Sequence, residues 1–111
     1  MKIVYVAGAY SADNVIGLLD NIRNGQRWGT KVFLKGFAPF CPWNDLHFQL
    51  MLREGEVLDV QQYYDYSMAF LERSDIVFVT PNWEESKGTI AEIARAEELG
   101  IPVVYSIEDL K

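Results

Sequence analysis

Apolar residues follow two alternating patterns along this chain, and together the patterns predict an α/β fold. Near-continuous apolar runs, typical of strands buried on both faces, occupy residues 2–7, 37–40, 75–80 and 102–105. Apolar residues recur at helical spacing in residues 14–35, 60–73 and 87–99. A short helix is also expected near 45–53, and a turn or short helix in 106–111.

The order of these segments predicts how they are arranged. Strands that alternate with helices favour a doubly wound parallel sheet of four to five strands, a flavodoxin- or Rossmann-like three-layer sandwich. We expect residues 1–111 to form it as one domain. Ligands of such sheets bind beyond the carboxyl ends of the strands. The segments "GAYSA", "CPWND" and "TPNWEESKGT", which follow the first three strands, are therefore the candidate ligand-binding loops.

The first helix carries two further signals. Asp13 or Ser11 could cap its start. Gly25 and Gly29 share one stripe of the helix, which predicts a close approach to the sheet at some cost in helix stability.

Composition narrows the possible function classes. Half of the 111 residues are hydrophobic and 23% are charged, as in a globular domain. A net charge of −6 argues against binding of a nucleic-acid polymer, although a helix N-terminus can still hold a small phosphate ligand. With one cysteine (Cys41) and one histidine (His47, for which we expect no catalytic role), we expect no disulfide, metal or redox cofactor. We see no signal peptide or membrane span, and expect no membrane partner and a cytoplasmic protein.

Glu92 is the most informative residue of the third helix. It lies one turn after Gly88, and helical side chains lean toward the helix start, so Glu92 should point into the space that a glycine leaves open. The amides of that first turn, beside Ser86, Lys87 and Thr89, would form an anion site next to the carboxylate. The alternative is a serine-capped helix with a tolerated glycine and a solvated glutamate.

Familiar nucleotide motifs are absent, because "AGAYSADN" matches neither G-x-G-x-x-G nor a P-loop.

The segments "KIVYVAGAYSA", "PFCPW" and "ERSDIVFVTPNWEESKGTIAEIARAEELGIPVV" resemble the nucleoside 2-deoxyribosyltransferase superfamily over nearly the whole chain. They resemble most its small members, which include 2′-deoxynucleoside 5′-phosphate N-glycosidases and many uncharacterised phage and bacterial proteins. The resemblance implies that Glu92 attacks C1′ of the sugar to form a glycosyl-enzyme. It also implies that Tyr5 orients the glutamate, although a core aromatic is the alternative.

The resemblance implies an aspartate on the helix before the third strand, but Ser67 stands at that position. Asp65 is the nearest acid and our candidate third catalytic residue, although on an ideal helix it would be turned away. The general acid is therefore either Asp65 or absent.

Candidate substrate-binding residues surround this centre. The resemblance implies that Tyr10 and Ser11, in the loop after the first strand, contact the sugar or phosphate, although Ser11 could instead be merely a helix cap. Trp43 and Asn44 after the second strand, and Trp83 after the third, could form walls around a flat base. The tryptophans could instead simply complete the core. Arg23 matches a basic position of the family, or is a solvated helix residue. The full set is Gly8, Tyr10, Ser11, Arg23, Trp43, Asn44, Trp83, Ser86, Lys87, Gly88 and Thr89.

These residues predict cleavage of the N-glycosidic bond of a deoxynucleoside or its 5′-monophosphate. Resolution of the intermediate by water would make the protein a hydrolase, and resolution by a second base a transferase; Lys87 and Ser86 favour a monophosphate and hydrolysis. The alternatives are a non-catalytic nucleotide sensor, which the Ser67 departure favours, and a structural domain. The family and the "YYDYSMAF" helix also predict a homodimer or higher homo-oligomer.

Overall fold

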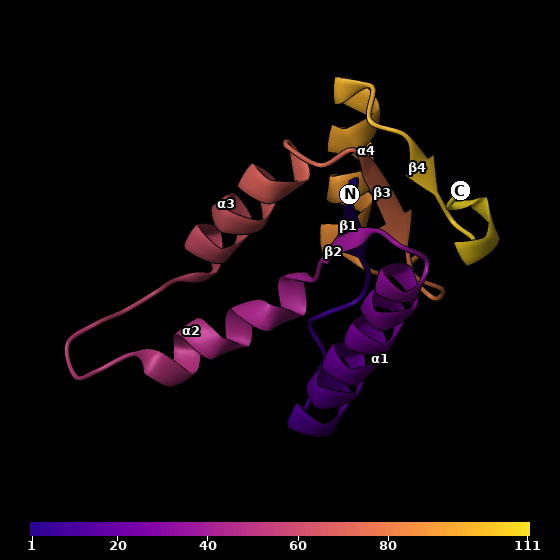
Figure 1. The fold of residues 1–111 in the computed structure, drawn as a ribbon. Coiled ribbons are helices and arrows are strands. Elements are labelled where there is room, and N and C mark those ends of the chain that lie inside the picture. The colour runs from indigo at the N-terminus through magenta and orange to yellow at the C-terminus, as the bar shows by residue number, and fades with distance from the viewer.

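A computed structural model describes all of residues 1–111, and at its centre is a sheet of four parallel strands. The strands are β1 (Ile3–Ala7), β2 (Ala38–Phe40), β3 (Ile76–Val79) and β4 (Val103–Val104). Their spatial order is β2-β1-β3-β4, so β1 and β3 lie at the centre (Figure 1). The strand order reverses between β1 and β3, which is where ligands bind in doubly wound sheets.

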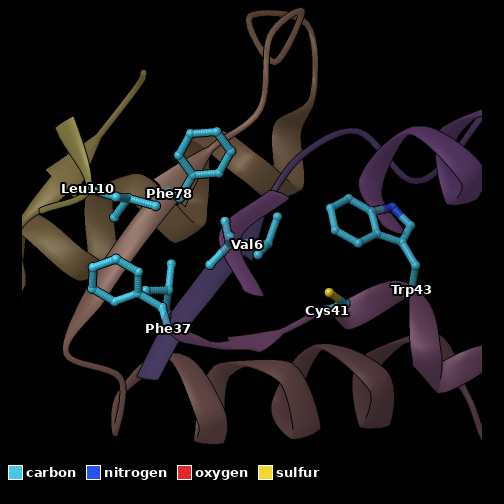
Figure 2. Packing of buried hydrophobic residues seen from close by; sticks show 8 residues of the cluster. Val6, Phe37, Cys41, Trp43, Phe78 and Leu110 are labelled. Carbon is cyan, nitrogen blue, oxygen red and sulfur yellow. The ribbon is translucent and has the colours of Figure 1, made fainter. Parts of the chain in front are cut away.

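Helices cover both faces of this sheet. The face toward α1 (Val15–Leu34) is built from Val4, Val6 and Phe78, which pack with Phe37 and Leu110 (Figure 2). The opposite face carries Tyr5, Ala7 and Val77, which pack with Ile93 of α4 (Lys87–Leu99). Successive residues of β1 therefore face opposite layers, as the pleat of a strand requires. The predicted fold class is confirmed, and the structure has four strands.

The remaining elements form an arm on one side of the sheet. A 3₁₀ turn, η1 (Pro42–Asp45), leads into α2 (Leu46–Met51), and α3 (Val60–Leu71) returns to β3. Figure 1 shows α2 and α3 projecting from the sheet, joined at the far end by a loop. A capping box fixes the start of α3, because Asp59 and Gln62 each accept the other's backbone N–H. A second 3₁₀ turn, η2 (Ile107–Asp109), lies near the C-terminus.

The start and the glycine stripe of α1 differ from expectation. Asn14, rather than Asp13 or Ser11, caps the helix: its Oδ1 accepts the Gly17 N–H at 2.8 Å. A Cβ at Gly25 would lie 2.3 Å from the Trp43 ring, and one at Gly29 would lie 2.3 Å from Cys41 Sγ. The glycine stripe therefore packs α1 against the segment that follows β2.

No helix of this structure is both long enough and apolar enough to cross a membrane.

Candidate active site

A cavity of about 1200 Å³ opens beyond the carboxyl ends of β1 and β3. One wall is the loop after β1 together with η1 and the start of α2. The arm helix α3 forms the opposite wall, through Val60, Tyr63, Tyr64 and Ser67. The loop before α4 and the first turns of that helix close the third side. The cavity thus lies where the strand order predicts a ligand site.

Glu92 of α4 and Tyr5 of β1 form a hydrogen-bonded pair at this cavity. Glu92 lines it and is partly exposed, whereas Tyr5 is fully buried beneath it. The Tyr5 hydroxyl donates a hydrogen bond to Glu92 Oε2. Burial raises the pKa of Glu92 to about 7, and the bond from Tyr5 acts against that rise. Burial, and then the charge of Glu92, raises the pKa of Tyr5, so the phenol stays protonated and remains a donor.

The predicted space beside Glu92 is present at the start of α4. A Cβ built on Gly88 would meet only Tyr64 Cε1, at 3.9 Å, so a ligand group has room there. Ser86 caps the helix, and its Oγ accepts both the Thr89 N–H, at 3.3 Å, and the Thr89 hydroxyl, at 2.8 Å. The amides of Lys87 and Gly88 lie in the first turn, where the helix itself supplies no acceptor. They remain free to bind a ligand.

Most of the predicted substrate-binding residues line the cavity together with Glu92: Gly8, Tyr10, Ser11, Trp43, Ser86, Lys87, Gly88 and Thr89. Gly8 and Trp43 shape the wall of the cavity but have little surface with which to contact a ligand. A Cβ at Gly8 would lie 2.2 Å from Thr80 Oγ1, so only glycine lets the loop pass this close to the end of β3. Trp43 is 2% exposed, and its Nε1 donates to the Ala9 carbonyl at 3.0 Å.

Four predicted residues lie outside the cavity. Arg23 is exposed and pairs with Asp20 at 3.0 Å, and Asn44 is exposed and accepts from Gln26. Trp83 packs against Tyr105, with ring centroids 5.6 Å apart, so it does not wall a base. Asp65 is exposed and accepts a hydrogen bond from Gln61 at 2.9 Å. Helix geometry turns Asp65 away from the cavity, as expected. Its position therefore does not support Asp65 as the catalytic acid.

The most important residue that the sequence did not single out is Asp45. It ends η1, lines the cavity and is 8% exposed, and the Tyr10 hydroxyl donates to its Oδ1 at 2.6 Å. Burial raises the pKa of Asp45, against the effect of the Tyr10 bond. Its position in "CPWND", in a loop after a strand, was the available signal.

The aromatic lining of the cavity was also missed. Tyr63 and Tyr64 lie on the face of α3 that includes Val60 and Ser67, at i, i+3, i+4 and i+7 spacing. That periodicity could have identified them. Ser67 is buried close to Tyr5, where its hydroxyl acts to lower the pKa of the phenol.

Comparisons with known proteins agree with this architecture. Residues 2–105 match the sequence profile of a family described as Domain of unknown function (DUF4406). Among solved structures, the chain is similar to a 2-deoxyribosyltransferase from the psychrotolerant bacterium Bacillus psychrosaccharolyticus. The TM-score is 0.64 at 18% sequence identity, over 91% of this chain and 69% of that one. The two proteins therefore share a fold. No curated protein sequence matches the chain.

Proposed function

The chain belongs to the DUF4406 family, and from the geometry of its cavity we propose that it cleaves the N-glycosidic bond of a deoxynucleoside or its 5′-monophosphate. The observation that carries the proposal is the Tyr5–Glu92 pair. A carboxylate is held by a buried phenol at the floor of a cavity, next to an open space large enough for a sugar carbon. A solvated helix glutamate would have no such partner.

In the proposed reaction Glu92 is the nucleophile. Tyr5 holds Oε2, so the attacking oxygen is fixed relative to the rigid strand β1. A carboxylate oxygen forms a bond to C1′ while the C1′–N bond breaks and its electron pair leaves with the base. The product is a covalent glycosyl-enzyme. Because the pKa of Glu92 is raised to about 7, the nucleophile becomes fully ionised only above neutral pH.

The fate of the intermediate separates two candidate activities. Attack by water on C1′ would complete a hydrolysis, and attack by a second base would complete an exchange. The free amides of Lys87 and Gly88 support a 5′-phosphate and hydrolysis, because helix N-termini bind anions. The fold that the chain shares with a 2-deoxyribosyltransferase supports the exchange reaction.

The first test is chromatography of deoxynucleosides and deoxynucleoside monophosphates after incubation with the protein. We expect release of free base by the wild type and none by Glu92→Ala or Glu92→Gln. Glu97→Gln is the matched control, since Glu97 is exposed on the same helix and outside the cavity. Addition of a second base then tests exchange. Absence of base release from every compound, or release that survives Glu92→Gln, would contradict the proposal.

We also propose that the protein acts as a homo-oligomer. The arm presents several exposed apolar side chains that the monomer leaves uncovered: Phe48, Leu50, Met51, Val57, Val60 and Phe70. Association through the arm would cover them close to the cavity. Sedimentation equilibrium should give a dimer or larger mass, and a strictly monomeric mass would refute this part.

A further inference from the structure

We propose that Asp45 is the general acid of the site, which protonates the nucleobase as it leaves. This inference rests on the proposed function and assigns the role for which the sequence offered only Asp65. Asp65 is exposed on the outer face of α3 and outside the cavity, and Ser67 has no carboxyl group. The cavity therefore needs another source for the proton.

The position of Asp45 is not explained by a structural role in its helix. It occupies the N-cap position of α2, yet its side chain makes no capping hydrogen bond. The carboxyl group is instead turned toward the loop after β1, where the Tyr10 hydroxyl donates to Oδ1 at 2.6 Å. Because η1 runs directly into α2, the backbone of Asp45 is helical and its side chain does not cap α2; the side chain is free to face the cavity.

One oxygen of Asp45 remains available to a ligand. Oδ1 is held by Tyr10, and Oδ2 has no hydrogen-bond partner. The one buried side-chain polar atom without a partner is Thr80 Oγ1, so Oδ2 keeps accessible surface. Because Asp45 is 8% exposed and lines the cavity, that surface opens into the cavity. A proton on Oδ2 would point at the ligand.

Asp45 and Glu92 both act on the buried phenol of Tyr5. The charge of Asp45 raises the pKa of Tyr5, the same phenol that holds Glu92. Burial raises the pKa of both carboxyls, so each holds a proton more readily than a solvated carboxyl would. The titratable groups that share the cavity or its floor with Asp45 are Tyr5, Tyr10, Asp13, Tyr63, Tyr64, Glu85, Lys87 and Glu92. Asp13 and Glu85 are exposed, which leaves Asp45 as the second shielded carboxyl.

The reactive form has Glu92 ionised and Asp45 protonated, and these two groups supply both halves of the reaction. The Glu92 carboxylate forms the bond to C1′, and the electron pair of the C1′–N bond passes to the base. Asp45 transfers its proton to a ring nitrogen or oxygen of that base, which leaves neutral. Asp45 then accepts a proton from the water, or from the incoming base, that attacks C1′ and releases Glu92. The protonation states are thereby restored, with no other reactant.

The decisive variant is Asp45→Asn, which keeps an oxygen to accept the Tyr10 hydrogen bond but cannot donate the carboxyl proton. On the best substrate of the panel we expect kcat to fall by about 10²–10⁴. On 4-nitrophenyl 2-deoxyriboside, or its 5′-phosphate, we expect a loss of less than about threefold, because nitrophenolate leaves without a proton. Asp65→Asn is the matched control, and should lose nothing on either substrate.

The pH profile of the best substrate gives a second readout that a structural role would not change. Wild-type kcat/KM should be bell-shaped, because the reaction needs Glu92 ionised and Asp45 protonated. Asp45→Asn should lose the alkaline limb and keep the limb that belongs to Glu92. An Asp45→Asn variant that keeps wild-type kcat, or keeps the full bell, would overturn the inference. The proposed function fails by a different result: the wild type releases no base, or Glu92→Gln still releases it.

Discussion

Two tyrosine–carboxylate pairs lie at the same end of the sheet, and they are built differently. Tyr5 and Glu92 come from a central strand and a 13-residue helix, and Tyr5 has no exposed surface. Tyr10 and Asp45 come from a loop and a four-residue 3₁₀ turn, and Tyr10 is only partly buried. A nucleophile must be held at a fixed point, whereas an acid must follow a leaving group. The difference in rigidity suits the two roles that we propose.

The second pair depends on packing against α1, which the first does not require. The Trp43 ring lies against Gly25 of α1 and stacks on Tyr10, with centroids 6.5 Å apart. Trp43 also binds the Ala9 carbonyl through Nε1, so one buried side chain connects α1, the loop after β1 and η1. The loop pair is therefore positioned by a core residue rather than by regular secondary structure.

The largest expected effect separates the two phenols. Tyr5→Phe removes the donor that holds the nucleophile, and we expect kcat to fall by about 10²–10³. Tyr10→Phe leaves Asp45 in place and protonatable, and we expect a fall of only about tenfold. Steady-state base release measures both, with thermal unfolding as the check that each variant is folded. Equal losses would show that the pairs do not differ as proposed.

Packing of the loop pair can be tested through α1. Gly25→Ala places a methyl carbon 2.3 Å from the Trp43 ring, closer than van der Waals contact allows, and should lower the free energy of unfolding by about 1–3 kcal/mol. Gly88→Ala is the matched control, because the added carbon has open space and should not destabilise the fold. Urea denaturation followed by tryptophan fluorescence compares them. If Gly25→Ala is as stable as wild type, the close contact with Trp43 is not needed.

Burial of the Glu92 carboxylate predicts a pH-dependent stability. Its pKa is raised from 4.5 to about 7 on folding, so the folded state binds more protons between these values. Stability should therefore fall as pH rises through this window and then level off. Glu92→Gln should be more stable than wild type by about 3 kcal/mol at pH 8 and by almost nothing at pH 4. Glu97→Gln should show no such trend. A difference that is constant with pH would mean that Glu92 is not shielded.

The smallest expected effect tests the space above Glu92. Gly88→Ala should raise KM by about three- to tenfold and leave kcat within about twofold, because the methyl group narrows the substrate space without touching the carboxylate. Initial rates over a range of substrate concentrations separate the two constants. An unchanged KM would place the substrate elsewhere in the cavity.

Regular elements and their chemistry could be predicted from residue patterns alone. The helix predicted over 87–99 has those bounds in the structure, and the four strands lie in the apolar runs that predict them. Helical spacing also placed Gly88 one turn before Glu92, and turned Asp65 away from the cavity. These relations are local, because a repeat of 3.6 or 2 residues fixes which side chains share a face.

Contacts between irregular segments were decided by the tertiary structure. No periodicity relates Tyr10 to Asp45, 35 residues away, and their pairing depends on how α1 packs over Trp43. Trp83 has the flat aromatic ring that could stack on a base, yet that ring packs against Tyr105 and the second core cluster. Asn14 caps α1 although two neighbours had the same chemistry. Where several side chains can satisfy the same local rule, the choice among them depends on three-dimensional packing, which a residue pattern does not contain.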